Sequence, residues 1–124
     1  MLTRRGFLAS ATAVVGVAVG APASAHHGWR WTDDGTFELT GVIREARLGN
    51  PHGILEVDAE EERWIVEVGQ PWRNEQAGLT DALLSVGREI VASGQRASDE
   101  TELRMKAERL SIDGVLYDLY PNRD

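Results

Sequence analysis

The amino-acid sequence predicts a mainly β fold, a small barrel of five or six strands with one short helix. Short segments in which apolar and polar residues alternate recur between residues 37 and 120, as in half-buried strands. Stretches rich in glycine, asparagine and glutamate separate these segments and predict turns. One stretch that begins with Pro71 predicts a helix, because proline suits the first helical position.

A leader is predicted for residues 1–25. Arg4 and Arg5 stand just before an apolar run from Phe7 to Gly20, and the order Thr-Arg-Arg-x-Phe-Leu is typical of a twin-arginine export signal. This run has 14 residues, whereas a membrane-spanning helix needs about 20. We therefore expect a helical signal peptide that is cleaved and leaves a periplasmic protein without stable membrane insertion. An uncleaved anchor is the alternative.

Two positions fit the small-x-small pattern that precedes cleavage of a signal peptide. Cleavage after Ala-Ser-Ala gives a mature chain that starts at His26, and cleavage after Ala-Pro-Ala gives a start at Ser24. The first is favoured, because the second places proline beside the scissile bond. The predicted organisation is a signal peptide at 1–25, an irregular segment at 26–35 and a barrel domain at 36–124.

Charge and cysteine content restrict the function of the mature chain. Removal of Arg4 and Arg5 from the 13 basic side chains, against 20 acidic ones, leaves a net charge of −9. Such a chain repels phosphate backbones, so no nucleic-acid partner is expected. The sequence has no cysteine, which excludes disulfides, zinc–thiolate sites and cysteine nucleophiles.

The first half of the barrel contains three predicted strands. The strand at 37–48 is long, and its apolar positions change parity near Gly41, which predicts a bulge there. A turn with the sequence Gly-Asn-Pro-His-Gly follows, then a strand at 54–59. Three consecutive glutamates predict a solvated hairpin turn before the third strand at 64–68.

The second half begins with the helix, predicted from 71 to about 77 with its end at Gly78. A mixed apolar linker at 79–86 leads to strands at 89–95 and 104–112, and Asp-Gly predicts a hairpin before a short strand at 115–120. Three strands, a helix and two or three further strands are the element order of an OB-fold, with a small β-sandwich as the alternative.

The three histidines are the most specific chemical signal. His26 and His27 stand at the predicted mature start, and His52 lies in the Asn-Pro-His turn. A processed N-terminal histidine offers an amine and an imidazole, and a second imidazole would complete three nitrogen donors. Such a set suits Cu(II). We expect His26 and His52 as ligands before His27, because adjacent side chains of an extended segment point to opposite sides.

Three alternatives accompany this metal hypothesis. A start at Ser24 would place His26 third, so that an amine, two backbone amides and one imidazole could bind Cu(II) or Ni(II). Zinc is less favoured, since three histidines without cysteine need a particular tetrahedral closure. The histidines can also be incidental, with His52 bonded only to its own turn.

Four aromatic or basic residues are candidates for a ligand or partner surface. Trp29 and Trp31 share one face of the N-terminal segment and are expected to pin it to the barrel. Trp72 is expected to cap one end of the barrel, with Arg73 paired to a carboxylate. Trp64 is expected in the core.

The sequence resembles an uncharacterised family of small exported bacterial proteins, a domain of unknown function. The likeness rests on Ala-His-His at the processing site, Gly41, Asn-Pro-His at residues 50–52, Trp64 with Val-Glu at 66–67, and Leu84 before Gly87. It covers nearly all of the mature chain and implies an exported, OB-like barrel without supplying an activity. The Gly-Trp-Arg-Trp stretch after His27 departs from the small polar residue expected there.

Two functions remain open. The leading hypothesis is a periplasmic copper-binding protein that binds or delivers the metal, because no nucleophile elbow or phosphate loop is present. The alternative is a metal-free module that recognises a periplasmic protein or small ligand through the barrel surface. An enzyme with a copper centre is a third, weaker possibility.

Overall fold

The structure is a computed structural model that describes residues 29–123. The barrel unit begins at Trp31. Six strands form one sheet, and the chain has one α-helix, α1 (Pro71–Gln76), and one short 3-10 helix (Asp81–Leu84) among these residues. The strands are β1 (Phe37–Arg47), β2 (Ile54–Ala59), β3 (Glu62–Glu67), β4 (Glu89–Arg96), β5 (Arg104–Ile112) and β6 (Val115–Asp118).

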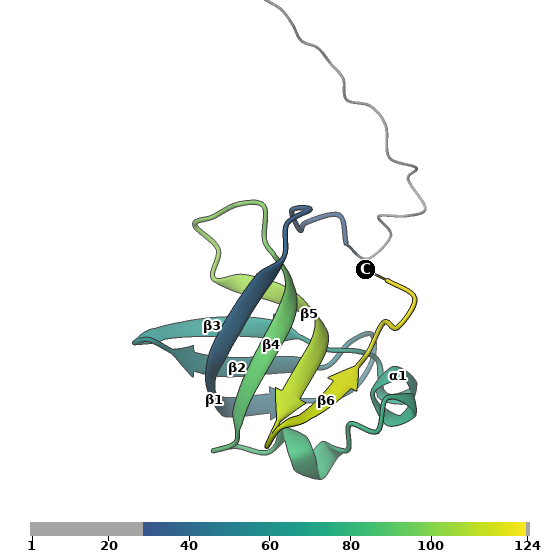
Figure 1. Cartoon of the computed structure of the whole chain (residues 1–124). Helices are drawn as coiled ribbons and strands as arrows, with labels where there is room; N and C mark the ends of the chain where they lie inside the picture. The colour runs from purple at the N-terminus through teal and green to yellow at the C-terminus, as the bar shows by residue number, and fades with distance from the viewer. Residues whose placement is uncertain (1–28, 124) are drawn as a thin grey trace, which may run out of the picture. The chain divides into compact units, whose positions relative to one another are not determined.

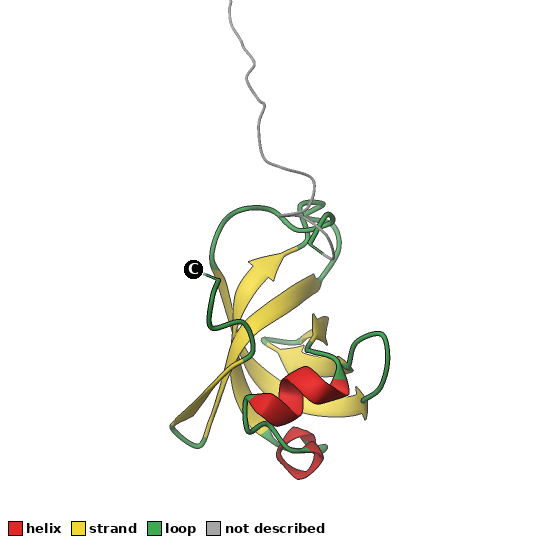
Figure 2. Ribbon diagram, turned by 90° about the vertical axis from the view of Figure 1, so that its right-hand side faces the viewer, coloured by secondary structure: helices red, strands yellow, loops and turns green. Residues whose placement is uncertain are grey.

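The predicted barrel is confirmed. The strand order is β3-β2-β1-β4-β5-β6, and a parallel pairing of β3 with β5 closes the first five strands into a barrel, with β6 as an extra edge strand (Figure 1). Both helices follow β3 and lie at one end of the barrel, and the β4–β5 loop lies at the other (Figure 2). This is the OB-like arrangement that the element order predicts.

The bulge predicted at Gly41 is wrong in position. The β1–β2 register shifts between Ile43 and Glu45, so the extra residue is Arg44. Gly41 has a different role: a Cβ there would lie 2.4 Å from the backbone oxygen of Asp58. The glycine therefore permits close approach of β1 to β2 where β1 changes partners from β4 to β2.

Most predicted boundaries agree with the structure within one or two residues. The helix ends at Gln76, and Gly78 has a φ of +84°, as expected for a residue that ends a helix. The predicted linker contains the 3-10 helix, with Thr80 as its N-cap. The last strand stops at Asp118 rather than at residue 120, because the Asp118 carboxylate accepts a hydrogen bond from the backbone N–H of Tyr120 and turns the chain.

The barrel interior is a single apolar core. Trp64 is 4% exposed, which confirms its predicted place in the core, and Leu84 and Leu119 are buried in the same core. Among residues 29–123, no helix is long and apolar enough to cross a membrane.

The segment before β1 is held by the loop between β4 and β5. Thr32 forms an isolated antiparallel bridge with Ala97. The N–H of Asp33 donates to the oxygen of Arg96, and the N–H of Ser98 donates to the oxygen of Trp31. These bonds fix the point at which the chain enters the barrel.

Candidate functional site

His52 is the one histidine among the described residues, because His26 and His27 lie outside them. It follows the cis peptide between Asn50 and Pro51 in the loop that joins β1 to β2. Its Nδ1 atom lies 3.5 Å from Oε2 of Glu67, at the end of β3. The His52 side chain is 32% exposed and that of Glu67 only 6%, so a buried carboxylate faces an accessible imidazole.

Glu67 is shared by three basic side chains. Nζ of Lys106 lies 3.0 Å from Oε2, and Nη2 of Arg104 lies 3.6 Å from Oε1. Glu67 and Lys106 are partners in the parallel β3–β5 pairing that closes the barrel. Lys106 is 2% exposed, and a buried ammonium is tolerated only with such a partner.

Burial lowers the pKa of His52, and the positive charges of Lys106 and Arg73 act in the same direction, against the opposing charge of Glu67. The neutral imidazole is therefore favoured. This is the form that can bind a metal ion.

A row of side chains leads from the start of the barrel unit to His52. The guanidinium of Arg104 lies 3.8 Å from the centre of the Trp31 ring, and the same guanidinium contacts Glu67. Trp31, Arg104, Glu67 and His52 are thus consecutive neighbours. Trp29 is buried, at 7% exposed.

Trp72 and Arg73 do not have the predicted arrangement. Trp72 is 52% exposed instead of capping the barrel, and its Nε1 donates to Oε1 of Gln70 at 2.7 Å. Within residues 29–123, Arg73 contacts rings and a carbonyl and forms no ion pair with a carboxylate. Its guanidinium lies 4.6 Å from the Trp72 ring and 4.2 Å from the Tyr120 ring. Its Nη1 donates to the backbone oxygen of Leu119, so the stack ties α1 to the C-terminal tail.

A hollow of about 290 Å³ lies beside this stack, between α1 and the C-terminal tail, with Trp72 and Arg73 in its wall. Burial raises the pKa of Tyr120, the residue on the other side of Arg73. An exposed indole beside a hollow is a feature of ligand sites as well as of protein interfaces.

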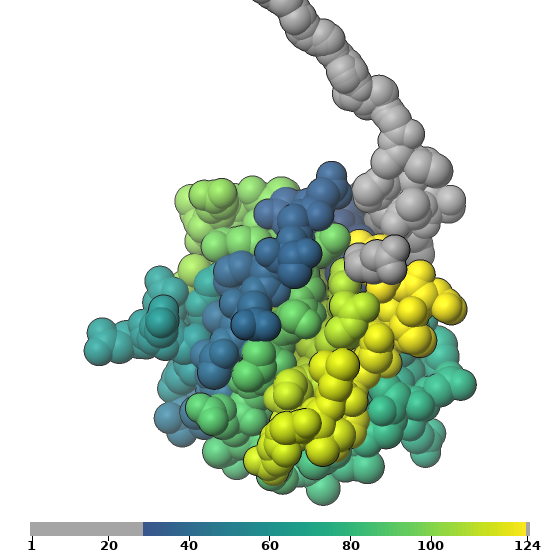
Figure 3. Space-filling view, viewed as in Figure 1, coloured from purple at the N-terminus to yellow at the C-terminus, as the bar shows by residue number. Residues whose placement is uncertain are grey.

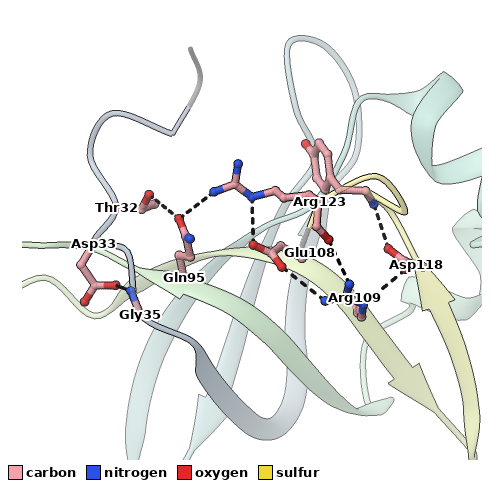
Figure 4. A network of polar contacts seen from close by, with 9 residues as sticks. Thr32, Asp33, Gly35, Gln95, Glu108, Arg109, Asp118 and Arg123 are labelled. Atoms are coloured by element: carbon pink, nitrogen blue, oxygen red, sulfur yellow. Dashed lines mark hydrogen bonds and ion pairs between the residues drawn. The ribbon is translucent and has the colours of Figure 1, made fainter. Parts of the chain in front are cut away.

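A second buried carboxylate, Glu108, was missed by sequence reasoning. Nε of Arg123 donates to its Oε2 at 2.9 Å, and Nη1 of Arg109 donates to its Oε1 at 3.3 Å (Figure 4). Arg123 also donates to Gln95, which accepts from Thr32, so the C-terminal tail and the N-terminal segment meet on one side chain. The network holds both ends of the domain on β4 and β5.

The signal for Glu108 was present in the sequence. Ser93 pairs with Arg109 and Gly94 with Ala107, so Glu108 is the extra residue of a bulge. The buried apolar residues of β5 accordingly shift from odd-numbered positions, Met105 and Ala107, to an even-numbered position, Leu110. This change of parity is the pattern that predicts a bulge.

The outer face of β1, β2 and β3 is a ladder of ion pairs. Nε of Arg44 lies 2.7 Å from Asp58, and Arg63 bridges Asp58 to Glu56. Arg47 lies between Glu56 and Glu45. Hydrogen bonds from Arg44 and then Arg63 lower the pKa of Asp58. The charges on this face therefore neutralise one another.

No three histidine, aspartate or glutamate side chains within the described part of the chain are arranged to hold a metal ion. His52 alone cannot form a tight site.

Two solved structures show the same fold at low identity. One is a ZRD-deleted mutant of TiaS in complex with agmatine, with 18% identity, a TM-score of 0.50, and coverage of 68% of this chain and 26% of that chain. The other is the S. pombe Stn1–Ten1 complex, with 15% identity, a TM-score of 0.51, and coverage of 62% and 57%. The chain therefore spans about a quarter and just over half of these two proteins.

No curated protein matches the chain. A family of unknown function, DUF6152, matches residues 13–104. This agrees with the resemblance to an uncharacterised family, and the chain belongs to DUF6152.

Proposed function

We propose that the protein is a periplasmic metal-binding protein that binds or delivers a metal ion rather than turning over a substrate. Copper is the first candidate for this ion. His52 and His26 are the proposed ligands, with His27 as a further candidate. The observation that carries the proposal is the contact of His52 Nδ1 with the buried carboxylate of Glu67. A carboxylate beside one ring nitrogen orients a histidine and leaves the other nitrogen, Nε2, for a metal.

The charged side chains around His52 affect which metal ions could bind there. Arg104 and Lys106 outnumber Glu67, so electrostatic attraction does not favour a cation here. Affinity must then come from nitrogen donors. This disfavours Ca²⁺ and Mg²⁺, which prefer oxygen ligands, and favours Cu(II).

The proposed site requires the N-terminal histidines to come within bonding distance of His52. Trp31 is linked to His52 through only Arg104 and Glu67. His27 lies four residues before Trp31 in the sequence, and four residues span at most about 14 Å. The twin-arginine leader predicted from the sequence would direct export, and cleavage before His26 would supply the amine donor.

Electron paramagnetic resonance of Cu(II) added to the purified mature protein tests the proposal. We expect a tetragonal, nitrogen-rich signal that is lost in His26→Ala and in His52→Ala. Glu67→Gln should retain the donor set and weaken binding by about tenfold, while the exposed Glu75→Gln leaves it unchanged. Full retention of the signal in both histidine variants would reject the proposal. Mass spectrometry of the natural N-terminus establishes which donors exist.

The half-exposed Trp72 beside a hollow favours a second candidate function, recognition of a small ligand or protein without metal. In that case the histidine variants behave like the parent protein. Trp72→Ala then abolishes capture of a partner from periplasmic extract, while Val86→Ala, at another exposed apolar side chain, does not.

A further inference from the structure

The C-terminal tail, residues 119–123, is attached to β5 beyond the end of β6. The N–H of Leu119 donates to the backbone oxygen of Glu108. Nε of Arg123 donates to Oε2 of the same Glu108 at 2.9 Å, and the backbone oxygen of Arg123 accepts from Nη2 of Arg109 at 3.1 Å. Arg123 thus attaches the end of the tail, which runs in yellow toward the end of the domain where the blue N-terminal segment lies (Figure 3).

The entry segment, residues 31–33, is attached to the loop between β4 and β5. The N–H of Asp33 donates to the oxygen of Arg96, and the oxygen of Trp31 accepts from the N–H and the hydroxyl of Ser98. This loop is itself held in shape, because Nη2 of Arg96 donates to two backbone oxygens within it. The amide protons of Asp33 and Ser98 therefore report whether the entry segment is in place.

One side chain of β4 joins these two attachments. Oε1 of Gln95 accepts from Oγ1 of Thr32 at 2.9 Å and from Nη2 of Arg123 at 3.1 Å (Figure 4). The guanidinium of Arg123 is held by Glu108, a buried carboxylate. Because Arg123 already restricts the rotamer of Gln95, the bond from Thr32 loses less conformational entropy than it would with a mobile glutamine.

We propose that the C-terminal tail is a strap that controls the entry segment. While Arg123 is docked, Gln95 is fixed and holds Thr32 on the barrel, and release of the tail loosens the entry segment. The two ends of the domain are then coupled through order rather than through a change of shape. The entry segment follows His26 and His27 in the sequence, so release of the strap lowers the affinity for metal. That consequence rests on the proposed function, whereas the coupling itself does not.

Amide hydrogen exchange of the purified mature protein without metal tests the strap. Arg123→Gln and Thr32→Val should each accelerate exchange at Asp33 and Ser98 by about fivefold or more, relative to Val57. Val57 lies on β2 between β1 and β3 and reports global unfolding. The double variant should exchange about as fast as the faster single variant, because each change alone already breaks the connection through Gln95.

The matched control is Arg88→Gln, which removes a guanidinium from the exposed pair with Asp113 and should leave the relative exchange rates unchanged. Two outcomes would overturn the strap. One is an effect in the double variant equal to the product of the two single effects, since the residues would then act independently. The other is an equal acceleration at Val57, since Arg123 would then stabilise the whole domain without coupling its ends.

A copper titration separates the strap from the proposed function. In a parent protein that binds Cu(II), Arg123→Gln and Thr32→Val should each raise the Kd by about fivefold, and Arg88→Gln should not. An unchanged Kd in both variants would overturn control of the metal site by the tail. A parent protein that does not bind Cu(II) would reject the proposed function, and the exchange rates alone would then decide the coupling.

Discussion

The ammonium of Lys106 lies 3.0 Å from the carboxylate of Glu67, and both side chains are almost fully buried on the strands that close the barrel. A buried ion pair of this kind is costly to break, because removal of one partner leaves the other charge without compensation. Since Glu67 also faces His52 and Arg104, the same carboxylate connects barrel closure to the candidate metal site.

Glu67→Leu should therefore destabilise the protein by about 3–5 kcal/mol, measured by urea unfolding. Lys106→Met should cost less, because Arg104 still accompanies Glu67. The double variant should be more stable than the sum of the two losses predicts, with a coupling of about 1 kcal/mol or more. Asp113→Asn, at the exposed pair with Arg88, is the control and should change stability by less than about 1 kcal/mol. Strict additivity of the two core substitutions would contradict this account.

The barrel could be predicted from the sequence because its signals depend on local structure alone. These signals are the alternation of apolar and polar residues in the strands, the turn residues, and the proline at the start of the helix. Asp113 and Gly114, for example, have positive φ values of 53° and 81°, as their hairpin requires. The Glu67–Lys106 pair was not predictable in this way. It joins strands that are distant in sequence, and charged residues in a strand are ordinarily expected to be exposed. His52 was identified from its turn, but its carboxylate partner depends on the fold.

Substitution of Gly94 should lower the stability of the protein more than its sequence context indicates. A Cβ at this position would lie 2.1 Å from the backbone oxygen of Lys106 and 2.9 Å from the N–H nitrogen of Glu108, which are backbone atoms of the β5 bulge. Gly94→Ala should therefore destabilise the protein by about 2–3 kcal/mol in chemical unfolding.

Gly49→Ala is the matched control for Gly94→Ala. No atom lies within 4 Å of a Cβ at Gly49, so this change should be neutral or stabilise by up to about 1 kcal/mol. Similar losses in both variants would show that the bulge does not restrict Gly94.

Tyr120 should make the protein sensitive to alkaline pH. Its pKa is raised by burial, so the folded state retains the phenolic proton at pH values where the unfolded chain, with a pKa near 10, begins to lose it. Stability is then fully present below about pH 10 and falls as the pH rises through the folded pKa.

Tyr120→Phe should flatten the decrease in the unfolding midpoint above about pH 10. A phenolate absorbance titration of the parent protein and of this variant assigns the ionisation directly. An unchanged alkaline slope in Tyr120→Phe would assign the pH dependence to other groups.

The β2–β3 hairpin should be stabilised by the residues that usually occupy its turn. Glu60 and Glu61 have φ values of 51° and 68°, in the left-handed region where asparagine and glycine are favoured in two-residue hairpins. Glu60→Asn combined with Glu61→Gly should therefore raise the free energy of unfolding by about 1–2 kcal/mol. A variant that is no more stable than the parent would show that the glutamates adopt this turn without strain.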